Sequence, residues 1–310
     1  MHLEGMPISS LWRPGPICIH RLCSVASRLA VMALFVCIGG RSVCFSQWIG
    51  KQTDCYQDTI AANPNRPTVS NPAHVTQYGV LELEYGWDHY WLKGGVRQAS
   101  MTGLLKFGML CDIELRWTIT PFLSQTDSQG THQTFGDNWL GTEVRLHRQT
   151  RRVPTMAVSY GLKFPSAATD HGLGTGKFDH FITLAASEHA WHFNFDINLT
   201  QYIIARQNAS GFDQNQQLAI ALSRPLHGAL QFSGEIYGNT RLNEANPGFV
   251  SSLWALSYTV FPRLVIDGGF EAGLTPGGPH RHVFAGFTYS IAELYRAGRR
   301  RSRRSDKGCD

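Results

Sequence analysis

In many segments of this chain, charged and polar side chains recur at every second residue, with apolar side chains between them. Residues 191–202, WHFNFDINLTQY, give the clearest case, with Asp196 between Phe195 and Ile197. A period of two places the polar side chains on one face of a β-strand and the apolar ones on the other. Polar side chains on neighbouring strands can pair as ions, or can line a lumen and select solutes by charge.

Twelve charged or histidine side chains are predicted to share this polar face and to line a candidate solute path. Two interpretations of them remain open. In the first, the electric field of these side chains favours the passage of cations or polar solutes through the lumen. In the second, they form cross-strand ion pairs that fill a narrow barrel. They are Glu82, Glu84, Lys106, Glu114, Arg116, Glu143, Arg145, His192, Asp196, Glu235, Asp267 and Glu271.

Catalytic chemistry has weaker support in the sequence. A hydrolase needs a serine hydrogen-bonded to a histidine that a third group orients. Ser159 and His192 are the polar-face candidates, but no nucleophile motif surrounds either, and their expected strands are not neighbours. The segment HGLGTGKF (171–178) has His and Phe where a phosphate-binding loop requires Gly and Ser or Thr. We therefore expect no enzyme, no catalytic residues and no cofactor.

No metal site or disulfide framework is expected either. His280 and His282 stand two residues apart, but no third ligand is identifiable. Of seven cysteines, only Cys55, Cys111 and Cys309 follow the leader. Their spacing allows a Cys55–Cys111 bridge without requiring one.

Twelve segments with this alternation must position the polar residues, and no helical periodicity separates them. The intervals between segments alternate strictly between short and long, as in a transmembrane barrel with tight periplasmic turns and long external loops. A β-sandwich explains amphipathic strands but has no reason to keep this rhythm. The segments are 79–91, 102–109, 112–120, 138–148, 154–164, 178–188, 190–201, 214–223, 226–239, 249–260, 262–273 and 280–291.

The predicted fold is therefore all-β, an antiparallel up-and-down transmembrane β-barrel of about 12 strands over residues 79–291. Its apolar face meets lipid and its polar face the lumen. In 191–202, the lipid-facing residues would be Trp191, Phe193, Phe195, Ile197 and Leu199, and the lumen-facing residues His192, Asn194, Asp196 and Asn198.

The regions outside the barrel have their own signatures. Residues 1–46 contain a basic segment, a short apolar run and a small-residue cleavage pattern, which predict a signal peptide. Residues 47–78 are polar and interrupted by prolines, and are expected to form an irregular N-terminal periplasmic arm. Residues 292–310 are expected to be a basic, disordered tail. Seven basic and two acidic residues from Arg296 onward account for the whole formal net charge of +5. Residues 1–295 therefore sum to zero, so we expect no nucleic-acid partner.

Five segments occur in the same order as in a known family. They are NRPTVSNPAHVTQYGVLELEYGW, GLLKFGMLCDIELRWTI, FGDNWLGTEVRL, PTMAVSYGLKFPS and PRLVIDGGFEAGL. Over residues 64–291 the chain resembles the transporter-like outer-membrane barrels named for the MetA pathway of phenol degradation. The motif positions are Arg66, Pro67, Gly108, Asp112, Glu114, Gly136, Asp137, Gly141, Pro262, Asp267 and Gly268.

The resemblance implies a passive or facilitated conduit for small solutes, with aromatic or hydrophobic compounds as the implied class. Such barrels usually end at an aromatic residue, whereas this chain continues beyond Ile291. We predict a porin-like transporter or channel in the bacterial outer membrane, most simply a monomer. Its expected partners are membrane lipid, a small-molecule solute and the barrel assembly machinery. The alternatives are a non-conducting structural or adhesion barrel and, less favoured, a barrel hydrolase.

Overall fold

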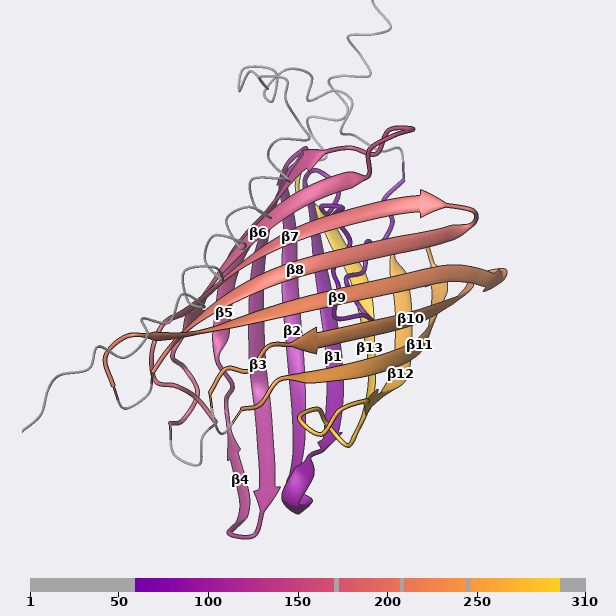
Figure 1. The fold of residues 1–310 in the computed structure, drawn as a ribbon. Coiled ribbons are helices and arrows are strands. Elements are labelled where there is room, and N and C mark those ends of the chain that lie inside the picture. Colours follow the sequence, from indigo (N-terminus) through magenta and orange to yellow (C-terminus); the bar gives the residue numbers. More distant parts are fainter. Residues whose placement is uncertain (1–58, 170–172, 207–208, 244–245, 296–310) are drawn as a thin grey trace, which may run out of the picture. The chain divides into compact units, whose positions relative to one another are not determined.

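The computed structural model describes residues 59–169, 173–206, 209–243 and 246–295. The predicted signal peptide, the first part of the arm (47–58) and the tail beyond residue 295 lie outside these residues. The described ranges contain thirteen strands and one 3-10 turn, arranged as a single sheet (Figure 1). The elements are β1 (Val80–Trp91), η3 (Lys93–Gly95), β2 (Arg97–Leu110), β3 (Ile113–Asp127), β4 (Gly130–Thr134), β5 (Asn138–His147), β6 (Thr155–Phe164), β7 (Asp179–Ala190), β8 (Phe193–Ala205), β9 (Phe212–His227), β10 (Leu230–Asn239), β11 (Phe249–Phe261), β12 (Leu264–Gly273) and β13 (Arg281–Glu293).

The sheet closes on itself as an antiparallel barrel. Neighbours in sequence are neighbours in the wall, β1 pairs with β13, and β2 pairs with both β1 and β3. The first half of β3 pairs with β5, and its second half pairs with β4. β4 therefore extends one hairpin beyond the rim, where Figure 1 shows it projecting from the wall. The predicted twelve-stranded up-and-down barrel is confirmed, with β4 as one extra strand.

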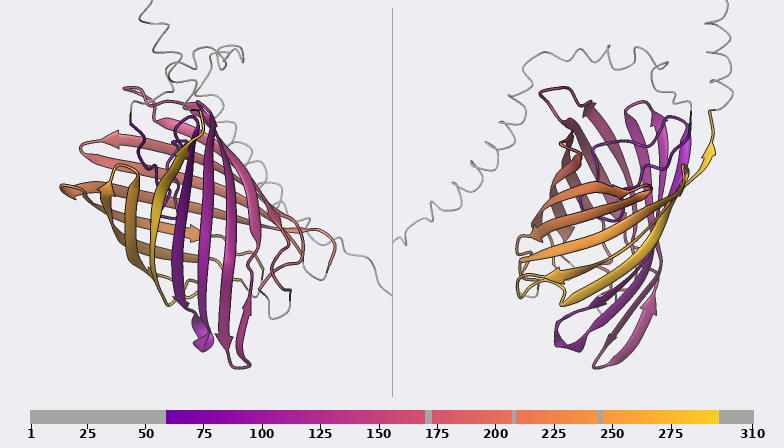
Figure 2. Two further views of the ribbon diagram at one scale, coloured as in Figure 1. Left: turned by 180° about the vertical axis from the view of Figure 1, so that it is seen from behind. Right: turned by 90° about the vertical axis from the view of Figure 1, so that its right-hand side faces the viewer.

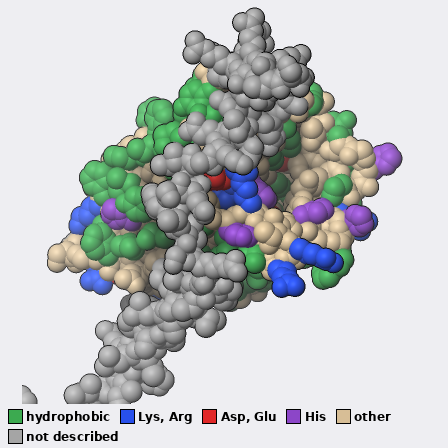
Figure 3. All heavy atoms as spheres, turned by 90° about the horizontal axis from the view of Figure 1, so that it is seen from above, with side chains coloured by type: hydrophobic (Ala, Val, Ile, Leu, Met, Phe, Trp, Pro, Cys, Tyr) green, Lys and Arg blue, Asp and Glu red, His purple; other side chains and the backbone are tan. Residues whose placement is uncertain are grey.

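The two faces of the wall have opposite chemistry. Large apolar side chains of the strands are exposed on the outer face, including Leu140, Ile220 and Leu256. Glu114 and Glu143, on the inner face, are completely buried. In the view along the barrel, hydrophobic side chains lie around the periphery and acidic ones appear near the centre (Figure 3). A soluble protein would have this arrangement inverted. No helix among the described residues is long and apolar enough to cross a membrane.

One turn lies where the alternation predicts continuous strand. Trp191 and His192 both have positive φ, 50° and 69°, and form the two-residue turn between β7 and β8. His192 is thus exposed in a turn and does not line the lumen, and Trp191, which is 84% exposed, is not on the lipid-facing row of β8. A two-residue turn with positive φ at both residues does not interrupt the alternation of polar and apolar residues, so the alternation alone does not reveal the turn.

The polypeptide before β1 runs inside the barrel. Residues 59–78, the described part of the predicted arm, form no helix or strand and lie against the inner wall. Figure 2 shows this indigo segment within the ring of strands. Its Ala73 is completely buried against Ala157 of β6 and Ala185 of β7. The lumen is therefore occupied by part of the chain itself.

Candidate functional site

The lumen-facing charges of β1 and β2 form a buried cluster around Lys106. Its Nζ lies 2.8 Å from Glu82 Oε1 and 2.6 Å from Glu84 Oε1, and all three side chains are almost fully buried. The same ammonium donates to the carbonyl oxygen of Asn63 on the arm. The carboxylates in turn accept hydrogen bonds from the arm: Glu82 from Asn63 N and Glu84 from Asn65 N, each at 2.8 Å. The cluster thus fixes where the arm enters.

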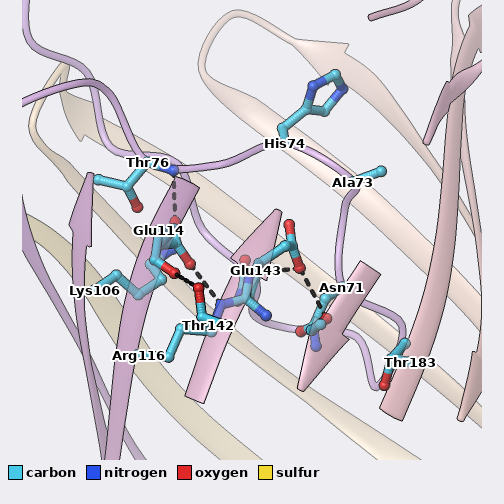
Figure 4. A network of polar contacts seen from close by, with 12 residues as sticks. Asn71, Ala73, His74, Thr76, Lys106, Glu114, Arg116, Thr142, Glu143 and Thr183 are labelled. Carbon is cyan, nitrogen blue, oxygen red and sulfur yellow. Dashed lines mark hydrogen bonds and ion pairs between the residues drawn. The ribbon is translucent and has the colours of Figure 1, made fainter. Parts of the chain in front are cut away.

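A second buried cluster lies on β3 and β5 (Figure 4). Arg116 is placed between Glu114, 2.5 Å from its Nε, and Glu143, 2.9 Å from its Nη2. Glu114 also accepts a hydrogen bond from Thr76 N on the arm at 2.5 Å. Ser159 of β6 donates to Glu143 at 3.2 Å. This cluster holds the segment by which the arm leaves the lumen and joins β1.

A third contact joins Arg66 of the arm to Asp267 of β12. The Arg66 Nη2 lies 3.0 Å from Asp267 Oδ1, and its Nε is 3.2 Å from both carboxylate oxygens. The guanidinium lies over Gly86 and Gly286, which face each other on β1 and β13. A Cβ at these positions would lie 2.3 Å and 2.6 Å from guanidinium atoms. Only glycine leaves room for the arginine to lie flat on the wall.

Between these contacts the arm crosses the lumen. Val69 N and Ser70 N donate to the two carboxylate oxygens of Glu235 on β10, at 2.7 and 2.6 Å. Asn71 N donates to Asn198 of β8, whose amide donates back to the Asn71 carbonyl oxygen. These bonds attach the middle of the arm to the side of the barrel opposite β2.

The arm forms no helix or strand of its own, so its backbone N–H groups lack regular partners within the arm. An irregular buried segment must find acceptors elsewhere, because an unpaired buried N–H is costly. Here side-chain oxygens of the inner wall supply them, from β1, β3, β7, β8 and β10. Neither interpretation of the polar face predicted that its side chains bind the arm. The donors are backbone N–H groups, which every residue except proline carries, so the sequence does not mark them.

The remaining predicted site residues are placed differently. Arg145 pairs with Asp112 at the β2–β3 turn, at 2.6 Å, rather than with the acids of β3 and β5. Glu271 binds the His282 ring at 2.8 Å and accepts from the Tyr237 hydroxyl at 2.5 Å. Asp196 accepts a hydrogen bond from Ser187 on β7. With His192 in a turn and Ser159 bound to Glu143, the candidate hydrolase residues form no pair.

Two cavities lie on opposite sides of the arm. The outer vestibule, about 970 Å³ at the long-loop end, is lined by Val69 of the arm and by Tyr90, Tyr202, Tyr237 and Phe249 of the wall. The inner chamber, about 230 Å³ toward the short-turn end, has other lining residues. They include Asn65, Arg66, Thr68, Pro72, Asp196, Ser223, Ser233 and Ser257. Residues 66–72 of the arm therefore form the partition between the two cavities.

Comparisons with known proteins identify the architecture. No model of a known protein family matches the chain, and no curated protein matches its sequence. An outer-membrane channel from Pseudomonas putida is similar in structure, with a TM-score of 0.56 and 10% identity, over 76% of this chain and 99% of that one. The translocator domain of the autotransporter NalP from Neisseria meningitidis matches with a TM-score of 0.44 and 10% identity, over 70% of this chain and 90% of that one. The likeness to the Pseudomonas putida channel shows that the chain has the fold of a bacterial outer-membrane β-barrel.

Proposed function

We propose that this chain is a porin-like channel of the bacterial outer membrane, which passes small solutes between the two cavities of its lumen. The observation that carries the proposal is the pair of cavities, about 970 and 230 Å³, each lined in part by residues from the 66–72 segment of the arm. The apolar outer face supports insertion in lipid. Membrane lipid, the barrel assembly machinery and a solute are the partners that follow, and a monomer is the simplest form.

The solute class we propose is small aromatic or hydrophobic compounds, as the family resemblance implies. The outer vestibule supports this class, because its wall carries the rings of Tyr90, Tyr202, Tyr237 and Phe249. Aromatic side chains of this kind can stack on flat apolar solutes.

Planar-bilayer recording of the refolded full chain tests the channel. We expect small discrete current steps, because the arm narrows the lumen. A variant that combines Glu235→Ala and Asn198→Ala loses two attachments of the arm and should give larger or more frequent openings. Absence of single-channel current in every salt, from both proteins, would reject a channel.

A non-conducting structural or adhesion barrel is the second candidate. It is favoured by the buried Lys106 and Arg116 clusters, which fill the lumen and hold the arm. The same recordings distinguish it from a channel. We also propose that the chain is not a hydrolase. Detergent-dependent ester hydrolysis that Ser159→Ala abolishes would contradict this.

A further inference from the structure

Asp196 is a lumen-facing carboxylate at the wall of the inner chamber. It lies on β8 opposite Ser187 of β7, whose hydroxyl donates to its Oδ1 at 2.5 Å. The residue is only 9% exposed, and it lines the chamber together with Ser223, Ser233 and Ser257. Its charge therefore faces a small polar space and not bulk water.

The other buried carboxylates among the described residues all have compensation. Lys106 pairs with Glu82 and Glu84, Arg116 with Glu114 and Glu143, Arg66 with Asp267, Lys163 with Asp179, and the His282 ring contacts Glu271. Glu235 accepts two backbone N–H groups.

Asp196 has neither form of compensation. No basic side chain in the described part of the chain forms an ion pair with it, and its hydrogen bond comes from a neutral hydroxyl. A buried carboxylate without a counter-charge is costly, so a mobile cation in the chamber would be attracted to it.

The lining of the chamber offers further ligands. Ser223, Ser233 and Ser257 line it together with Asp196. Their hydroxyl oxygens can accept hydrogen bonds from the hydration shell of a bound ion or coordinate the ion directly.

We propose that Asp196, with the serine hydroxyls that line the inner chamber, binds a small monovalent cation there and sets the charge preference of the pore. The ligand is an alkali ion or a small primary ammonium ion, which share one positive charge and small size. The effect on selectivity rests on the proposed channel function, whereas binding of the cation does not.

The variant Asp196→Asn tests the proposal with little change of shape. In recordings under a potassium chloride gradient, it should lower the ratio of potassium to chloride permeability by about fivefold, which corresponds to about 1 kcal/mol. The matched control is Glu188→Gln, which removes the same charge from the adjacent position of the wall. Glu188 is exposed and on the opposite face of β7 from Ser187, so its loss should not change the ratio. An unchanged ratio in Asp196→Asn, or an equal change in the control, would overturn the role in selectivity.

Cation-dependent stability tests the site without any current. At equal ionic strength, potassium or methylammonium should raise the urea midpoint of the wild-type protein relative to tetraethylammonium, which is bulkier and has no N–H donors. Asp196→Asn should lose this difference. Stabilisation by potassium alone identifies an alkali-ion site, and stabilisation by methylammonium alone an ammonium site. No difference between the three salts in the wild type would overturn the binding site, whereas absence of current alone rejects only the channel.

Discussion

At the scale of single residues, buried clusters of opposite charges stabilise the inside of the barrel, and each charge depends on its partners. Lys106 is fully buried between two carboxylates and the arm. Loss of one member of such a cluster leaves uncompensated charge in a dry environment, which costs more than the cluster itself contributes. Lys106, Glu82 and Glu84 therefore both bind the arm and stabilise the fold.

Replacement of the central cation, Lys106→Met, should lower the free energy of unfolding by about 3–5 kcal/mol, because Glu82 and Glu84 are left buried without a partner. Urea unfolding in detergent micelles measures the change. Addition of Glu82→Gln and Glu84→Gln should recover most of the loss, whereas Lys93→Met, at an exposed position, should have little effect. A small loss in Lys106→Met would mean that water reaches the cluster.

The glycine pair under Arg66 gives a second prediction at this scale. Gly86→Val should destabilise the protein by about 1–3 kcal/mol, because the new side chain collides with the guanidinium. In the background Arg66→Ala the same substitution should cost much less, since the collision is absent. Equal costs in both backgrounds, in the same unfolding measurement, would show that the strand itself requires the glycine.

At the scale of elements, β8 shows which face of the wall meets lipid. Leu199 is at its centre, is 37% exposed, and lies between Leu184 of β7 and Leu218 of β9. Phe195, on the same face, is nearer the turn and opposite Glu188, which could pair with an introduced base. A charged substitution at the centre of β8 therefore tests the lipid-facing assignment better than one near the turn.

The variant Leu199→Arg should impair insertion into lipid vesicles and cost about 2–4 kcal/mol, as a base near the bilayer midplane does. The control Leu199→Phe keeps an apolar side chain and should insert as the wild type does. The yield of folded protein in vesicles, measured by protease resistance, provides the comparison. Normal insertion of Leu199→Arg contradicts the assignment of this face to lipid.

The arm can be tested by the reactivity of two consecutive positions. Ala73 is fully buried against the wall, and His74 is exposed. A cysteine at position 74 should react rapidly with a water-soluble maleimide, whereas one at position 73 should react only as fast as the arm leaves the wall. The unsubstituted chain gives the background of its own cysteines. Equal rates at both positions would place the arm outside the lumen.

At the scale of the whole molecule, closure of the barrel brings the polar faces of all the strands together around one lumen. Arg66 and Asp267 are 201 residues apart, yet one ion pair joins them. Both belong to the segments that carry the family resemblance, so those segments coincide with an attachment of the arm. Closure also explains why the buried groups of this protein are mainly charged and hydroxylated, since its apolar groups are committed to the outer face.

The sequence by itself determined the twelve strands of the closed wall and their order, although not the extra strand β4. Alternation is a local property of each strand, and it places Glu82, Glu114 and Glu143 on the polar face, where the structure has them buried. His192 was misplaced, because alternation continues through a two-residue turn.

Only the tertiary structure decided what the inner face binds. The arm follows no period, and its donors are backbone N–H groups that every residue except proline carries. Their partners, such as Glu235 for Val69, lie 166 residues away in sequence. The closed wall brings them together, and in doing so leaves Asp196 as the buried lumen carboxylate, among the described residues, with neither a cation nor backbone N–H donors beside it.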